Sequence, residues 1–262
     1  MKPLSRAEFL LMAALMGACL WAVFGPAVAQ TPHYHRFADQ RSWLGIPCAT
    51  DVLTNAFFAL AGAWGLCRCG SDKCGHFGQQ GDVRRALAAV FFGGLVVTSA
   101  GSAYYHLRPD NLGLAWDRLG MALAFAGLLG LAVADRISAR AGVAVLWTTL
   151  VAGPVAVWVW YLTGNLLAWS VLQGGGMVLI LALACLQSVR GEKGLPLVSV
   201  ILLYALAKVM ELGDHWVFAW TQGVVSGHSL KHVVAAMAAL PVLAVMHNRS
   251  PAGVSHGHPL SA

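Results

Sequence analysis

Eight apolar stretches, each about as long as a bilayer is thick, divide this 262-residue sequence. A helix needs about 20 mostly apolar residues to cross the hydrocarbon layer, so each stretch predicts a membrane-spanning helix. Composition agrees, because 58% of the residues are hydrophobic and only 11% are charged, too few to cover a soluble domain of this size. The connections are short, which indicates one all-α integral membrane domain. The stretches are residues 9–29, 51–69, 86–105, 114–134, 141–161, 166–187, 195–213 and 228–246.

The first stretch differs from the others in its flanks. Lys2 and Arg6 precede it, and the small residues Ala27 and Ala29 end it in the pattern of a signal-peptide cleavage site. Residues 1–29 are therefore either a signal peptide, which the pattern slightly favours, or an additional N-terminal helix. We expect an outer segment at 30–50, a seven-transmembrane helix bundle at 51–246 and a cytoplasmic tail at 247–262.

The distribution of basic residues predicts the orientation. Cytoplasmic loops of membrane proteins are enriched in Lys and Arg. If Gln30 emerges outside, nine basic residues lie on the inner side and three on the outer side, so the core begins outside and ends inside. No basic run is interleaved with aromatic residues, so the net charge of +6 does not indicate a nucleic-acid partner. The inner residues are Arg68, Lys73, Arg84, Arg85, Arg136, Arg140, Arg190, Lys193 and Arg249, and the outer ones are Arg36, Arg41 and Arg108.

Polar and ionisable residues gather at the outer ends of three predicted helices. Ser102 and His106 end one apolar stretch, Asp117 begins the next, and His228 and His232 begin the last. Ionisable groups inside membrane segments are expensive and mark functional or paired structural sites. Three helices that are separate in sequence thus carry polar groups at one membrane depth.

The spacing of the histidines indicates a metal site. His228 and His232 are four residues apart, so their rings share one helical face, and His106 supplies a third ligand. Three histidines with an open fourth position are typical of catalytic zinc, where Asp117 can act as general base toward a metal-activated water. A histidine in a membrane can also be an interhelical hydrogen-bond partner, and an i, i+4 pair alone would equally suit haem or copper.

Three short motifs resemble the alkaline ceramidase family, in a bacterial-type form. They are Ser102-Ala103-Tyr104-Tyr105-His106, Trp116-Asp117-Arg118-Leu119 and Gly227-His228-Ser229-Leu230-Lys231-His232. The family belongs to a superfamily of seven-transmembrane proteins that includes adiponectin receptors and Per1-like lipid-remodelling proteins. The resemblance spans roughly residues 51–246.

This resemblance implies a buried Zn²⁺ held by His106, His228 and His232, with Asp117 acting on the zinc-bound water and Ser102 supporting the site. The implied reaction is hydrolysis of the amide of ceramide or a related N-acyl lipid to a fatty acid and a sphingoid base. The alternatives are a receptor-like or lipid-sensing protein with structural zinc, and a lipid esterase or phospholipase. Animal members bind calcium through an acidic stretch that residues 39–47 lack, so we expect no calcium site. The orientation places the zinc site on the outer side of the cell membrane.

Two further groups of polar residues have weaker signals. Lys208, Glu211 and Asp214 recur every three residues, with His215 following, and we expect an ion pair between Lys208 and Glu211. Asp214 and His215 could form the outer mouth of a cavity. A second group, Cys67, Cys69, Cys74 and His76, matches no strong metal pattern, and we expect free thiols there.

Overall fold

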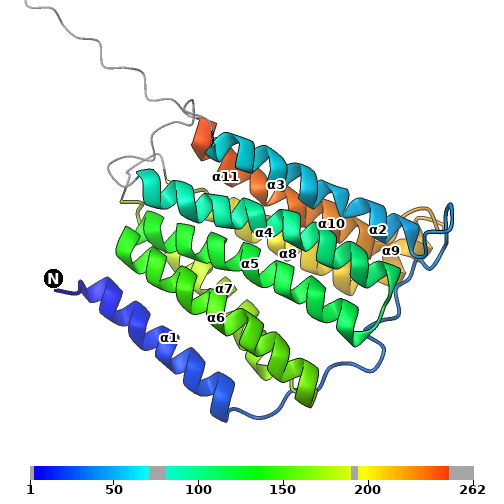
Figure 1. Ribbon diagram of the computed structural model, residues 1–262, viewed down its shortest axis with the longest axis horizontal. Coiled ribbons are helices and arrows are strands. Elements are labelled where there is room, and N and C mark those ends of the chain that lie inside the picture. Colours follow the sequence, from blue (N-terminus) through cyan, green and yellow to red (C-terminus); the bar gives the residue numbers. More distant parts are fainter. Residues whose placement is uncertain (1–2, 71–80, 190–193, 248–262) are drawn as a thin grey trace, which may run out of the picture.

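The computed structural model describes residues 3–70, 81–189 and 194–247, and over these ranges the chain is an all-α bundle (Figure 1). Helix ends coincide with local capping signals: Asp110, Ser138 and Ser226 each accept a hydrogen bond from a backbone N–H of the first turn that follows them. The helices are α1 (Arg6–Phe24), α2 (Ala49–Thr54), α3 (Ala56–Cys69), α4 (Gly81–Leu107), α5 (Asn111–Arg136), α6 (Ala139–Thr163), α7 (Leu167–Ala184), α8 (Leu197–Leu212), α9 (Asp214–Trp220), α10 (Gly227–Met237) and α11 (Ala239–His247).

Seven helices of the described part are long and apolar enough to cross a membrane, which confirms the predicted class of fold. These seven spans differ by one helix from the seven-helix core that the sequence predicted. Six of them come from the predicted core, and the seventh is the N-terminal helix α1. The remaining core helix, α8, has 16 residues, or about 24 Å of helix, and is shorter than each of the seven spans. The seven spans are α1, Ala49–Cys69, α4, α5, α6, α7 and Gly227–Met246.

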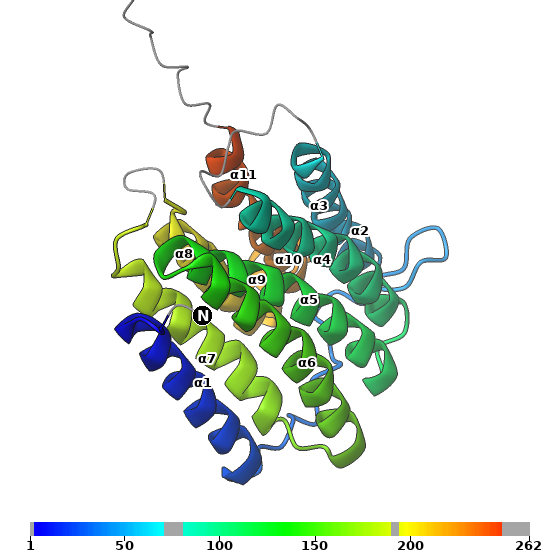
Figure 2. The same ribbon diagram turned by 60° about the vertical axis from the view of Figure 1, so that its left-hand side comes forward.

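Helix α5 occupies the centre of the bundle and α1 its edge. Of the most apolar window of each helix, 78% is buried in α5 and 11% in α1. Figure 2 shows α1 lying beside α7. The segment that contains α1 is nonetheless bound to the bundle near both of its ends: Ser138 donates a hydrogen bond of 2.7 Å to Glu8, and the Leu166 N–H donates one of 2.7 Å to the Val28 carbonyl, beyond the end of α1. Both ends of the segment predicted as a signal peptide or extra helix therefore contact α6 or the α6–α7 connection.

A close backbone approach aligns the last turns of α4 with the first turns of α5. We call this end of the bundle, which the sequence predicts to face outward, the outer end, and the opposite end the inner end. A Cβ atom at Gly101 would lie only 2.5 Å from the Trp116 carbonyl oxygen, so this contact requires glycine. Because Ser102 follows Gly101 and Asp117 follows Trp116, the same contact brings these two polar residues to one level. The packing thus sets the relative height of two candidate site residues.

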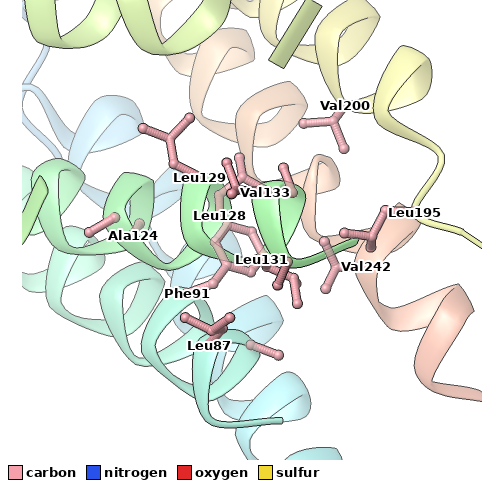
Figure 3. Packing of buried hydrophobic residues seen from close by; sticks show 14 of the residues in the cluster. Leu87, Phe91, Ala124, Leu128, Leu129, Leu131, Val133, Leu195, Val200 and Val242 are labelled. Carbon is pink, nitrogen blue, oxygen red and sulfur yellow. The ribbon is translucent and has the colours of Figure 1, made fainter. Parts of the chain in front are cut away.

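The inner half of the bundle is packed with apolar side chains. Leu87 and Phe91 of α4 lie against Leu131 of α5, and Leu195 and Val242 close the cluster from the side of α8 and α11 (Figure 3). All five are buried. This core holds together the helices whose outer ends carry the polar residues.

Candidate metal centre

The three predicted histidine ligands meet in one buried cluster. Ser226 caps α10, so that His228 and His232 project from adjacent turns of one face, and His106 comes from the last turn of α4. The ring centroids lie 4.8 Å (His106–His228), 5.0 Å (His106–His232) and 4.9 Å (His228–His232) apart. One ring nitrogen of each histidine lies within 4.8 Å of the other two, so this group could hold a metal ion.

Unpartnered nitrogens within the cluster fit metal binding. Neither ring nitrogen of His106 has a hydrogen-bond partner, although the residue is fully buried, and Nε2 of His232 is unpartnered too. Buried polar atoms in native proteins are nearly always hydrogen-bonded, so such orphans need an explanation. A metal ion at the centre of the triangle would supply a partner for one ring nitrogen of His106 and for Nε2 of His232.

Thr54 fixes the orientation of His232. Its hydroxyl lies 2.9 Å from His232 Nδ1 and donates to the Thr50 carbonyl at 2.8 Å. Because the single hydroxyl proton is used there, His232 Nδ1 must donate to Thr54, and the lone pair of this histidine then resides on Nε2, within the cluster. An outer partner of this kind sets the tautomer of a metal-binding histidine. Sequence reasoning missed Thr54, whose only signal was a hydroxyl in the first turns of an apolar stretch.

Lys231 contacts the third histidine. Its Nζ lies 2.9 Å from His228 Nε2 and 3.4 Å from Glu211 Oε1. A lysine that donates to Nε2 occupies the lone pair that a metal would use at this nitrogen. Metal binding through Nε2 therefore requires Lys231 to turn toward Glu211.

Two buried carboxylates brace the site, and both act through backbone or hydroxyl groups. Asp214 accepts hydrogen bonds from the N–H groups of His228, at 2.8 Å, and Ala38, at 2.9 Å. Asp51 accepts from Ser229 at 2.6 Å. The cavity-mouth role considered for Asp214 is thus replaced by an anchoring role at the start of α10. Asp51 was missed, and its position at the beginning of a membrane stretch was the available signal.

The outer segment covers the cluster. The ring of Phe37 lies 4.5 Å from that of His106 and 4.7 Å from that of His228, measured between centroids. Asp39 holds this segment in place by accepting hydrogen bonds from Arg41 and Thr50. The hydrogen bonds and charge of Arg41 lower the pKa of Asp39 from 3.8 to about 2. Phe37 therefore covers the histidine cluster, and Asp39 fixes the segment that carries Phe37.

Ser102 and Asp117 are buried together beside the histidines. Ser102, in α4, and Asp117, in α5, are both buried. Both residues line a cavity that is also lined by His228 and His232. A close contact of α10 with α8 places this wall, because a Cβ atom at Gly227 would lie 2.2 Å from the Met210 carbonyl oxygen. The five predicted site residues thus lie in one region of the bundle.

The cavity continues inward from the histidines between apolar side chains. On α4 its lining includes Leu95 and Phe91, and on α5 it includes Met121 and Leu128. Phe91 lies 15 residues before His106, which corresponds to about 22 Å along an α-helix. The cavity therefore joins a polar wall near the outer side to an apolar wall deep in the bundle.

The secondary expectations have separate outcomes. The ion pair between Lys208 and Glu211 is confirmed, with 2.5 Å between Nζ and Oε2. His215 lies away from the cluster and contacts the Arg36 carbonyl at 3.2 Å. Cys67 and Cys69 end α3, where Cys67 is exposed, whereas Cys74 and His76 lie outside the described residues.

Comparisons with protein-family models, with curated proteins and with solved structures give no match to this chain. The chemistry of the site is therefore argued from its own geometry.

Proposed function

We propose that this protein is a zinc-dependent membrane amidohydrolase of the alkaline ceramidase type, which cleaves the amide of ceramide or a related N-acyl lipid. The observation that carries the proposal is the buried histidine triangle, whose unpartnered nitrogens lie beside Asp117 and Ser102 on the wall of one cavity. The residues fit zinc, which accepts imidazole nitrogens and commonly uses three histidines at catalytic sites. A metal that only stabilised the fold would need neither the aspartate nor the serine.

Zinc bound at this site would acidify a water molecule and polarise the carbonyl of the substrate. Asp117 is the general base of the proposal: it takes the proton from the attacking water and returns it to the leaving amine. Ser102 lines the same cavity and orients the Asp117 carboxylate in this proposal. Thr54 keeps Nε2 of His232 deprotonated toward the centre of the triangle.

The shape of the cavity supports a lipid substrate. Its apolar part, lined by Leu95, Phe91 and Leu128, suits an acyl chain, and its polar part at Asp117 and His228 suits the amide. A chain that lies along α4 and α5 would place its carbonyl carbon at the outer end of the bundle. We propose that the scissile amide binds there.

The membrane and the orientation also belong to the proposal. We place the protein in the cell membrane with the histidine cluster near the outer surface, because basic residues favour the opposite side. Five of the nine inner residues are described, and Lys73, Arg190, Lys193 and Arg249 lie outside the described residues. With the native cysteines replaced, an impermeant thiol reagent should label Ser42→Cys and not Gly70→Cys in intact cells. The reverse pattern would invert the orientation.

The decisive experiment is Asp117→Asn, with zinc content and turnover measured on the same preparations. The variant keeps size and polarity but cannot accept the proton. Turnover of ceramide should fall by about 10²–10⁴-fold while zinc remains bound. Ser102→Ala should cost less, and Asp82→Asn, an exposed carboxylate at the inner start of α4, is the matched control.

Two results would overturn the proposal. An Asp117→Asn protein that holds zinc and turns over ceramide at the wild-type rate would remove the aspartate from the mechanism. Wild-type protein that holds zinc but cleaves no ceramide, acyl amide or lipid ester would favour the receptor-like alternative. Cleavage of esters alone would identify a lipid esterase.

A further inference from the structure

Arg118 is a buried cation on the cavity wall that the proposed reaction does not use. It follows Asp117 on α5, is only 2% exposed, and lines the same cavity as Asp117 and His228. It lies seven residues after the start of α5, or about 10 Å from the outer end of that helix.

The surroundings of Arg118 are aromatic. Its guanidinium carbon lies 4.0 Å from the ring centroid of Trp160, 5.5 Å from that of Trp169 and 5.6 Å from that of Tyr34. These rings come from α6, α7 and the outer segment, and their faces attract the cation. They hold the plane of the guanidinium without neutralising its charge.

Hydrogen bonding of the guanidinium is incomplete. Nη2 donates to Gln30 Oε1 at 2.9 Å, but Nη1 is buried and has no acceptor in good geometry, although the Tyr34 hydroxyl is near. Among the described residues no carboxylate lies within ion-pair distance of Arg118. A purely structural arginine that ties Gln30 to the bundle would explain the hydrogen bond of Nη2, but not the missing partner of Nη1.

The charged side chains that line the cavity also single out Arg118. Its described lining contains three cationic side chains, Arg118, Lys208 and Lys231, and two carboxylates, Asp117 and Glu211. Both lysines pair with Glu211, so among these three cations Arg118 is the one with no described carboxylate within ion-pair distance. A buried charge is normally paired, and the planar fork of arginine matches a carboxylate or phosphate.

We propose that Arg118 binds an anionic oxygen group, a carboxylate or a phosphate, on the amine half of the lipid. The natural substrate is then an N-acyl lipid with an anionic head, in preference to neutral ceramide. This inference rests on the proposed hydrolase function for its substrate, but the anion site itself is a property of Arg118 and its aromatic neighbours.

The first test compares matched lipid pairs with wild-type protein. N-oleoylglycine and N-oleoylethanolamine share an acyl chain and differ in a carboxylate against a hydroxyl; ceramide 1-phosphate and ceramide differ in a phosphate. We expect kcat/KM to be about tenfold or more higher for the anionic member of at least one pair, because a charge-assisted hydrogen bond forms only there. A preference within the N-oleoyl pair would identify the bound group as a carboxylate, and a preference within the ceramide pair would identify it as a phosphate. Equal values within both pairs would overturn the inference.

The second test uses variants of two arginines. Arg118→Gln should bring the ratio within the preferred pair close to one, and Arg118→Lys, which keeps the charge but loses the fork, should give an intermediate ratio. Arg108→Gln is the matched control, because Arg108 is exposed and pairs with Asp110 outside the cavity, and its ratio should equal that of wild type. An unchanged ratio in Arg118→Gln would overturn the assignment. If that variant does not fold, the wild-type ratio decides.

Binding separates this inference from the proposed function. Calorimetry with N-oleoylglycine and metal-free wild type, which cannot turn it over, should show tighter binding than with N-oleoylethanolamine. Arg118-dependent binding without hydrolysis of any lipid would overturn the hydrolase and support the anion site. Hydrolysis of both members of each pair without preference would support the hydrolase and overturn the anion site.

Discussion

The outer and inner ends of the bundle are formed by the same helices but bury different kinds of side chain. At the outer end, α4, α5 and α10 bury His106, Asp117, His228 and His232, and Asp51 joins them from α2. At the inner end the same helices contribute to a continuous apolar core (Figure 3). Polar groups in a membrane are expensive, and each end buries some of them. At the inner end Asp135 is buried but accepts hydrogen bonds from the Leu195 N–H and from Ser188. At the outer end the ring nitrogens of His106 are buried without a partner, which indicates a function located there.

The largest expected effect is loss of the metal from the outer end. His228→Ala removes one of three ligands and places no new donor in the triangle, so zinc content should fall from about one per chain to none. Elemental analysis of purified protein measures this. His215→Ala is the control, because this exposed histidine contacts the Arg36 carbonyl and is not a member of the histidine cluster, so zinc content should be unchanged. Full zinc retention in His228→Ala would exclude this histidine as a ligand.

A substitution in the inner core should affect stability and leave the metal in place. Leu131 is 1% exposed, and Leu131→Ala removes its contacts with Leu87 and Phe91. The free energy of unfolding should fall by about 2–5 kcal/mol, as is usual for a cavity-forming substitution. Denaturant titration in detergent measures the loss, and zinc per folded chain should equal that of wild type. Loss of zinc from the folded variant would show that the two ends are coupled.

A smaller effect, on metal affinity, is expected when Thr54, which orients His232, is replaced. Thr54→Val keeps the shape of the side chain but removes the acceptor for His232 Nδ1. Such changes typically weaken metal affinity by about 10–100-fold. Competition with a chelator of known affinity measures the shift. Thr148→Val, an exposed hydroxyl on α6, provides the control. Equal affinities in wild type and Thr54→Val would exclude this role.

The smallest expected effect is the loss of stability in acid that comes from Asp39 in the outer segment. Arg41 holds the pKa of Asp39 at about 2, below the 3.8 of the unfolded chain. The stabilisation is therefore present above about pH 4 and is lost as the pH falls toward 2. Because Arg41 is half exposed, water screens the pair, and the effect should be modest. Asp39→Asn should remove this acid-dependent component of the unfolding temperature; an identical pH profile in both proteins would contradict it.

Much of this architecture follows from patterns close together in the sequence. Apolar runs of bilayer length predicted the helices, and the four-residue spacing of His228 and His232 placed both rings on one face, because helical periodicity is local. The N-terminal stretch was predicted as a helix, with removal slightly favoured; its contacts with Ser138 and Leu166 depend on residues far along the chain. Whether residues 1–29 remain attached is still a prediction.

Only the tertiary structure decided which residues support the histidines. Thr54, Phe37 and Asp214 reach the cluster from different elements, over separations of up to 178 residues. No periodicity encodes such contacts, because they depend on the heights at which helices pack, which close approaches such as Gly101 against Trp116 determine. The sequence by itself determined which side chains could meet on one helix face. Packing between helices determined how they are oriented, what covers them, and that Arg118 lies on the cavity wall with no carboxylate of the described residues within ion-pair distance.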